Sequence, residues 1–157
     1  MVKKQRAATK RATGKKRTGA GFEDLTVGQV LNKRVATARP DTKADQVAAL
    51  IVKGTGTVPV VDGAKRLVGV VSEHDLLLAL DEGQAWAVLR AKDIMSGNPY
   101  SARPEHNLPT LVHVLTESDL MSVPVADERN RFVGVVSRRD VVKAALKAGA
   151  AKRGSRP

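Results

Sequence analysis

Two short motifs combine a serine with an aspartate three residues later: Ser72 with Asp75, and Ser137 with Asp140. A serine at a helix start can accept a hydrogen bond from the backbone N–H three residues on. An acid at that later position can bond back to the serine N–H, as in a capping box. The free N–H groups and the dipole of a helix start also attract phosphate, and a nearby carboxylate can accept hydrogen bonds from sugar hydroxyls. Both motifs therefore predict helix starts, and both are candidate sites for a phosphorylated sugar.

The residues inside the two motifs carry different charges. Arg138 and Arg139 occupy the second motif, whereas Glu73 and His74 bring at most one partial positive charge to the first. Because guanidinium groups match phosphate oxygens well, the second motif is predicted to be the better polyphosphate site. The alternative is that both arginines are solvated on the helix surface, as charged side chains commonly are.

Other reactive chemistry has little support in this sequence. The chain has no cysteine, which excludes disulfides, thiolate zinc sites and cysteine nucleophiles. His74, His106 and His113 lack metal-ligand spacing, and there is no glycine-rich phosphate loop or nucleophile elbow. The sequence therefore predicts a protein that is not an enzyme and that requires no metal or cofactor.

The motifs belong to an internal duplication. Residues 58–75 align without a gap on residues 123–140, and eleven of the eighteen positions are identical. Upstream, residues 25–31 align on residues 89–95, and Pro40 aligns on Pro104. Arg39 and Arg103 precede these two prolines and could supplement phosphate contacts. Alternatively, their recurrence reflects only descent from one ancestral copy.

Each copy predicts the same order of elements. A short helix at 27–31 precedes an extended stretch at 35–38, which should end before Pro40. Thr42 is placed to cap a helix that Gly54 stops, with Val47, Leu50 and Ile51 on one face. Valine-rich strands at 58–61 and 67–71 follow, with counterparts at 123–126 and 132–136, and a helix begins at each motif serine. The predicted fold class is α/β (α+β), built from two packed strand-helix-strand-strand-helix units.

The duplicated pattern resembles the CBS domain over residues 25 to about 146. In each copy, Pro-Val is followed by an apolar residue, an Asp and a short loop, and then by Gly, two apolar residues and Ser-x-x-Asp. The resemblance implies two tandem β-α-β-β-α repeats packed about a pseudo-two-fold axis, with two clefts between them. We assign repeat 1 to residues 22–82 and repeat 2 to residues 83–148. Such modules often bind AMP, ADP, ATP or S-adenosylmethionine as regulatory ligands and often form homodimers, and we expect the same here.

Site residues carry over from the family by position. The serines, Ser72 and Ser137, would contact phosphate, and the acids, Asp75 and Asp140, would contact ribose. The apolar segments that include Val58, Pro59, Val123 and Pro124 would flank the base, together with the extended residues before Pro40 and Pro104. His74, Arg138, Arg139, Arg39 and Arg103 complete the candidate ligand-binding set.

The charge of +11 is concentrated at the ends of the chain. Residues 1–21 are predicted to be a disordered basic arm, and residues 149–157 a basic tail, because neither holds enough apolar side chains to fold. The arm could contact nucleic-acid phosphates nonspecifically, in which case the chain would be a nucleic-acid-associated protein with the CBS pair as a dimerising scaffold. Alternatively, the arm is a solubilising tail. Its candidate contacts are Lys3, Lys4, Arg6, Lys10, Arg11, Lys15, Lys16 and Arg17. Without cysteine, a signal peptide or a long apolar run, the chain is predicted to be cytoplasmic and without membrane contact.

Overall fold

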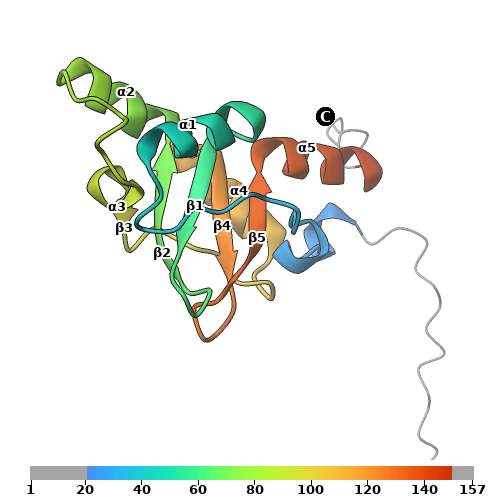
Figure 1. Cartoon of the computed structure of the whole chain (residues 1–157). Helices are drawn as coiled ribbons and strands as arrows, with labels where there is room; N and C mark the ends of the chain where they lie inside the picture. Colours follow the sequence, from blue (N-terminus) through green and yellow to red (C-terminus); the bar gives the residue numbers. More distant parts are fainter. Residues whose placement is uncertain (1–20, 150–157) are drawn as a thin grey trace, which may run out of the picture.

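Two β-hairpins form the centre of the protein in the computed structural model, which describes residues 21–149 (Figure 1). The first hairpin pairs β1 (Thr57–Val61) with β2 (Leu67–Ser72), and the second pairs β4 (Ser122–Ala126) with β5 (Phe132–Ser137). Both are antiparallel, and a short strand β3 (Ser96–Gly97) pairs with β2. Each hairpin has one register shift, at Val60 in β1 and at the equivalent Val125 in β4. The duplication in the sequence is therefore a duplication of structure.

Helices cover these hairpins and bury one apolar face each, as the three- and four-residue spacing of their apolar residues predicts. The longer helices are α1 (Ala44–Lys53), α2 (Glu73–Asp81), α4 (Leu108–Glu117) and α5 (Arg138–Lys147). The shorter ones are η1 (Phe22–Asp24), η2 (Val27–Gln29) and α3 (Ala91–Ile94). The predicted mixed α+β fold with two repeats is confirmed. None of the helices within residues 21–149 is long and apolar enough to cross a membrane.

The start of each repeat differs in detail from the prediction. The extended stretch at 35–38 forms only a single parallel bridge between Ala38 and Val60, matched by one between Ala102 and Val125. Thr42 does not cap α1, because its hydroxyl accepts a hydrogen bond from the backbone N–H of Arg39, 2.9 Å away. Lys43 occupies the N-cap position without a side-chain bond, and Gly54 ends the helix as predicted.

Two hydrophobic cores are each built from both halves of the sequence. Val27 of η2 is fully buried in the second core, beside α4 and β4, although it belongs to the first repeat in the sequence. Conversely, Ala91 of α3 is buried in the first core, and Trp86 packs there and donates its ring N–H to the carbonyl of Leu76. The segments that open each repeat therefore cross over and pack on the other repeat.

Glycine is needed where the crossing segments approach the hairpins. A Cβ on Gly134 of β5 would lie 2.6 Å from the carbonyl oxygen of Asn32, whose backbone bridges Val135. The equivalent Gly69 of β2 lies against the side chain of Met95. Both repeats thus have glycine at the same position because a crossing segment approaches the hairpin closely on each side.

Repeat-equivalent residues also meet where the two hairpins face each other. The hydroxyl oxygens of Thr57 and Ser122 lie 2.6 Å apart, and the backbones of Arg66 and Arg131 form an antiparallel bridge. Since each contact joins a residue to its own counterpart, the two repeats are related by an approximate two-fold axis. The predicted basic arm, with its eight candidate nucleic-acid contacts, lies almost wholly outside the described residues, as does most of the predicted basic tail.

Candidate functional site

Both Ser-x-x-Asp motifs form capping boxes at the starts of α2 and α5. The Ser72 hydroxyl accepts from the backbone N–H of Asp75 at 3.3 Å, while the Ser72 N–H donates to Asp75 Oδ2 at 2.7 Å. The corresponding distances at Ser137 and Asp140 are 3.2 and 2.8 Å. The capping interpretation is therefore confirmed at both positions. In each case the cap engages only one carboxylate oxygen, so it is compatible with a ligand contact at the other oxygen.

A cleft of about 730 Å³ lies between the repeats at these helix starts. This volume is within the range of small-molecule sites, roughly 300 to 1,000 Å³. Its walls come from the loops before β1 and β4, the first turns of α2 and α5, and the segment after β3. The lining includes Gly54, Thr55, Gly56, Thr57, Glu73, Ser96, Pro99, Tyr100, Asp119, Leu120, Met121 and Ser122 in addition to residues predicted from the sequence.

Seven of the predicted ligand-binding residues line this cleft. They are Ser72, His74, Asp75, Pro124, Ser137, Arg138 and Arg139. The two motifs, which the sequence analysis assigned to separate sites, thus contribute to one cavity. Two helix starts that face the same space both favour an anion there, because their first-turn N–H groups and dipoles act in the same sense.

The other six predicted residues lie elsewhere. Val58 and Val123 are buried in the two hydrophobic cores, and Pro59 is also fully buried, so their side chains pack inside the protein. The guanidinium of Arg39 donates to the carbonyl oxygen of Asp62 in the first hairpin loop. Asp140 and Arg103 are likewise absent from the lining of this cleft. A ligand in the cleft would therefore meet the acid of the first motif, Asp75.

Arg138 is neither freely solvated nor wholly available to a phosphate. Its Nε donates to the carbonyl of Leu120 at 2.7 Å, and its Nη2 donates to the carbonyl of Leu115 at 3.2 Å and to Asp119 Oδ1 at 2.9 Å. These bonds tie the start of α5 to the end of α4 and the loop that follows. Of the five guanidinium donors, the two on Nη1 have no partner within residues 21–149. Arg139 is exposed at the cleft and has no ion pair within the same range.

Tyr100 is a cleft residue that the sequence analysis did not single out. It lies in the extended segment before Pro104, which the family resemblance placed near a base, and its side chain is 48% exposed. A half-exposed aromatic ring at the wall of a cleft offers a flat apolar surface for stacking. The sequence held an indication of this position, because Tyr100 is the one tyrosine of the chain and stands in that segment.

The cleft mixes charges of both signs. His74, Arg138 and Arg139 line it together with Glu73, Asp75 and Asp119. The Glu73 carboxylate lies against Gly56, whose φ of +83° suits glycine. Among the residues that the structure describes, no group of three or more His, Asp or Glu side chains could hold a metal ion. The geometry therefore suits an organic anion with an apolar part better than a bare cation.

The family model of the CBS domain matches residues 27–82 and 91–147 of the chain. Fold, site and match together define a tandem CBS pair, and the chain belongs to the CBS-domain family. The matched ranges include η2 and α3, the two short helices that cross between the repeats.

Two similar proteins are the CBS domain-containing proteins CBSX1 and CBSX2, both chloroplastic, of Arabidopsis thaliana. They are 29% and 30% identical to this chain over 152 residues, and each alignment covers 77% of this chain. The chain spans 64% and 63% of the length of these relatives. A crystal structure of CBSX2 in complex with AMP matches 82% of this chain and 99% of its own, with a TM-score of 0.69 and 31% identity.

Proposed function

We propose that this CBS pair is a regulatory module that binds an adenosine-containing nucleotide, with AMP as the first candidate, in the cleft between its repeats. The observation that carries the proposal is the convergence of two serine-capped helix starts and Tyr100 on one cavity of about 730 Å³. The similar protein CBSX2 has been crystallised in complex with AMP, which supports the choice of ligand. The role is one of binding and signalling, without a chemical step.

The phosphate would lie at the starts of α2 and α5. First-turn N–H groups and helix dipoles favour an anion at this position, and Arg139 and the Nη1 group of Arg138 add positive charge. Glu73 lines the same part of the cleft and opposes additional negative charge. This balance favours a nucleotide with few phosphates over a triphosphate, in contrast to the preference for polyphosphate that the arginines alone predict.

The nucleoside would extend from there toward Tyr100. The capping box leaves one carboxylate oxygen of Asp75 free to accept hydrogen bonds from ribose hydroxyls. The adenine ring would stack on the half-exposed ring of Tyr100, next to Pro99 and Pro124. This assignment uses one polar group for the sugar and one apolar wall for the base, the usual composition of a small-molecule site.

Regulation requires that the ligand favours one arrangement of the protein over another. The cleft is formed by both repeats, so a ligand that contacts both helix starts would stabilise one relative packing of the repeats. We further propose that the module pairs as a homodimer, because several large apolar side chains on α2 and α5 are exposed. The ligand would then report its presence through the packing of the repeats or through the dimer contact.

Isothermal titration calorimetry of the full chain with AMP, ADP, ATP and S-adenosylmethionine tests the proposed ligand class. Asp75→Ala and Asp140→Ala form a matched pair, because each removes a capping box but only Asp75 lines the cleft. We expect AMP to bind, and Asp75→Ala to weaken it by about tenfold or more, the loss of roughly one charge-assisted hydrogen bond.

Asp140→Ala should leave the affinity of this cleft within about threefold of wild type, a difference below 1 kcal/mol. If the wild type binds a second equivalent of AMP and Asp140→Ala does not, there is an additional site at the second motif, as the sequence predicts. If none of the four ligands binds, or if Asp75→Ala binds AMP as wild type does, the proposed nucleotide site is rejected.

A further inference from the structure

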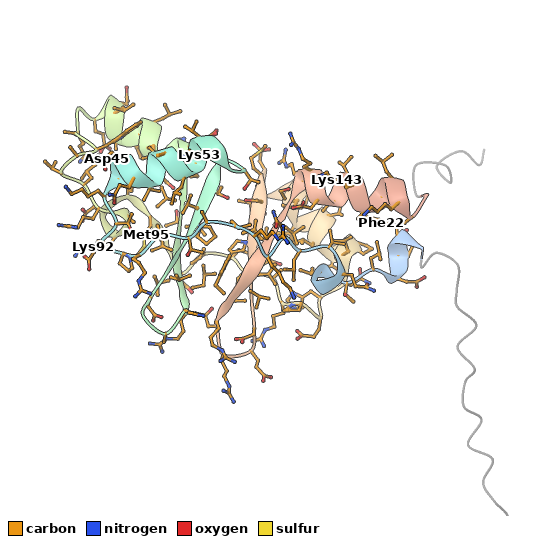
Figure 2. The ribbon with its side chains drawn as sticks, turned by 45° about the vertical axis from the view of Figure 1, so that its right-hand side comes forward. Phe22, Asp45, Lys53, Lys92, Met95 and Lys143 are labelled. Atoms are coloured by element: carbon orange, nitrogen blue, oxygen red, sulfur yellow. The ribbon has the colours of Figure 1, made fainter. Side chains whose placement is uncertain are left out.

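The loops that join β1 to β2 and β4 to β5 form a basic surface at one end of the molecule. Figures 1 and 2 show these two hairpin loops together at the lower end, with α1, α2 and α5 toward the upper side. Ala38 and Ala102 bond to the ends of β1 and β4, so the arginines that follow them lie beside the loops. The exposed basic residues of this loop surface are Arg39, Lys65, Arg66, Arg103, Arg129 and Arg131.

Positive charge is concentrated on the loop surface. It holds six basic residues and three acids, Asp62, Asp127 and Glu128, whereas the rest of residues 21–149 holds ten basic and thirteen acidic residues. The described part of the chain is therefore neutral as a whole but divided into a positive end and a negative remainder. The field of such a charge distribution draws an anionic partner to the positive end.

Two aspartates hold the loops and orient two of the arginines. The carboxylates of Asp62 and Asp127 each accept two backbone N–H groups of their own loop. Each also accepts an arginine Nε at 3.0 Å, from Arg66 and Arg131 respectively. The Nη groups of both arginines have no partner within residues 21–149, and the side chains are 60% and 51% exposed. Each guanidinium is thus fixed on its inner side, while its outer donors remain free for a ligand.

Arg66 and Arg131 are direct neighbours across the two loops. Their backbones form an antiparallel bridge, with one hydrogen bond between the loops on either side of it, of 2.9 and 2.8 Å. This is the non-hydrogen-bonded type of pair, in which the Cα atoms lie about 4.5 Å apart and the side chains are closest. Like charges in such a pair repel and destabilise the strands. An anion bound to both guanidiniums would remove this repulsion.

The loop surface lacks the apolar side chains that several kinds of partner require. Within residues 21–149, the large apolar side chains that are exposed lie on α1, α2 and α5, before α3 and at the cleft, and none lies in the two loops. Protein interfaces usually have an apolar core, single-stranded nucleic acid is held by aromatic stacking, and membrane surfaces are bound with apolar insertion. The phosphate backbone of a nucleic-acid duplex is bound by charge and hydrogen bonds alone.

Symmetry favours the same partner. Arg66 and Arg131 are counterparts in the duplicated sequence, so the approximate two-fold axis of the repeats passes between them. A nucleic-acid duplex has local two-fold axes that relate its antiparallel strands, and the two-fold axis of a protein commonly coincides with one of them. Arg39 and Arg103 are also counterparts, and they would extend the contact to further phosphates on the two strands.

From this surface we infer that the protein binds the phosphate backbone of double-stranded nucleic acid at its two hairpin loops, without reading the base sequence. The free Nη groups of Arg66 and Arg131 would donate to phosphate oxygens, and Lys65 and Arg129 would add charge beside them. Residues 1–20 hold eight basic residues and no acid, and would strengthen the attraction for the same partner. The loops lie at the opposite ends of the hairpin strands from the nucleotide cleft, so the inference does not depend on the proposed function.

Fluorescence anisotropy of a short labelled DNA duplex, titrated with the full chain at a series of salt concentrations, tests this inference. Lys65→Gln with Arg129→Gln removes two charges of the loop surface whose side chains make no hydrogen bond within residues 21–149, so the loops should keep their structure. Lys143→Gln with Lys147→Gln is the matched control, because it removes the same charge from α5. Figure 2 shows Lys143 on α5, away from the loops.

We expect the duplex to bind more weakly as salt is raised. Each lost phosphate contact makes the slope of log affinity against log salt shallower by about 0.9. The Lys65 and Arg129 variant should therefore have a slope shallower by about 2 than the wild type, and the control should keep the wild-type slope. Arg66→Gln with Arg131→Gln should also lower the slope by about 2. Urea unfolding of each variant verifies that the protein still folds.

Four results would overturn the inference. The first is no binding of the duplex by the wild type at low salt. The second is an unchanged salt slope in either folded loop variant, and the third is an equal change in the α5 control, which would mean that only net charge matters. The fourth is tighter binding of single-stranded DNA, or of vesicles that contain anionic phospholipid, than of the duplex. Binding of AMP by the same preparations is measured separately, so either proposal can fail while the other stands.

Discussion

The hydroxyl oxygens of Thr57 and Ser122 lie 2.6 Å apart, both residues line the cleft, and the two are counterparts in the duplicated sequence. Ser122 is almost completely buried, and Thr57 is half-buried. One short hydrogen bond thus joins the first residues of β1 and β4, each of which precedes a buried valine. Its position next to both helix starts makes it a direct link between the two repeats.

Removing one hydroxyl of this pair should destabilise the protein. Thr57→Val or Ser122→Ala leaves the remaining hydroxyl without its partner, which typically costs about 1 to 3 kcal/mol. The double variant should cost less than the sum, because it removes both polar groups. Urea unfolding of the four proteins measures the free energy of unfolding. Additive losses in the double variant would show that the two hydroxyls are not coupled.

The two glycines beside the crossing segments should differ in their tolerance of a methyl group. Gly134→Ala places a Cβ 2.6 Å from the backbone carbonyl oxygen of Asn32. Gly69→Ala meets chiefly the flexible side chain of Met95, and the nearest backbone atom, the Ser96 oxygen, is 3.1 Å away. Backbone cannot move aside as easily as a thioether side chain, so Gly134→Ala should be the more destabilising. We expect about 1 to 3 kcal/mol of extra loss at Gly134, measured by urea unfolding. Equal losses would contradict the close approach of Asn32 to β5.

The two neighbouring arginines of α5 should have different effects on stability. Arg138→Met removes three hydrogen bonds to the end of α4 and its following loop, and should lower the free energy of unfolding by about 1 to 3 kcal/mol. Arg139→Met changes an exposed side chain and should alter stability by no more than about 0.5 kcal/mol. Chemical unfolding of both variants checks the difference. Loss of stability in Arg139→Met alone would contradict the assigned contacts.

The two hairpin loops should make the protein sensitive to acid. Hydrogen bonds from the backbone N–H groups of Arg66 and Ala64 and from the Arg66 side chain hold the pKa of Asp62 below its ordinary value of 3.8. Asp127 has the same arrangement with Arg131 and Arg129, and its pKa is lowered in the same way. A carboxyl whose folded-state pKa is lowered stabilises the fold above its unfolded pKa. That contribution is lost as pH falls through the folded pKa.

The double variant Asp62→Asn, Asp127→Asn therefore tests the acid-sensitive contribution of the loops. Its thermal midpoint should fall less than that of the wild type between about pH 5 and about pH 2, because the amides do not titrate. Thermal melting curves of the wild type and the double variant across this pH range, at constant ionic strength, give the two midpoints to compare. Parallel declines of the two proteins would assign the acid sensitivity to other carboxyls.

Sequence reasoning succeeded where local pattern decides the structure. The duplication located both hairpins, and the Ser-x-x-Asp spacing located the starts of α2 and α5, because capping depends on residues three apart. It did not anticipate that η2 and α3 pack on the opposite repeats, since that choice depends on tertiary contacts. For the same reason it could not foresee that Arg138 reaches the carbonyl of Leu115, 23 residues earlier.

The predicted residues at the helix starts mostly line the cleft, whereas most of those on the strands are buried in the cores. Ser72 and Asp75 line the cleft, whereas Val58 and Val123 are buried in the cores because every residue after the first in β1, and every residue of β4, is buried. A strand that is covered on both faces gives no alternation from which to tell the ligand side from the core side. Tyr100 stands in the segment before Pro104 that the family resemblance placed near a base, but only the folded structure puts this segment beside the helix starts.

A crystal structure of the full chain grown with saturating AMP tests the central claim most directly. We expect one AMP in the cleft, with its phosphate at the starts of α2 and α5, its ribose on the Asp75 carboxylate and its adenine against Tyr100. An empty cleft at a concentration that calorimetry shows to be saturating, or AMP bound away from Ser72 and Asp75, would contradict it.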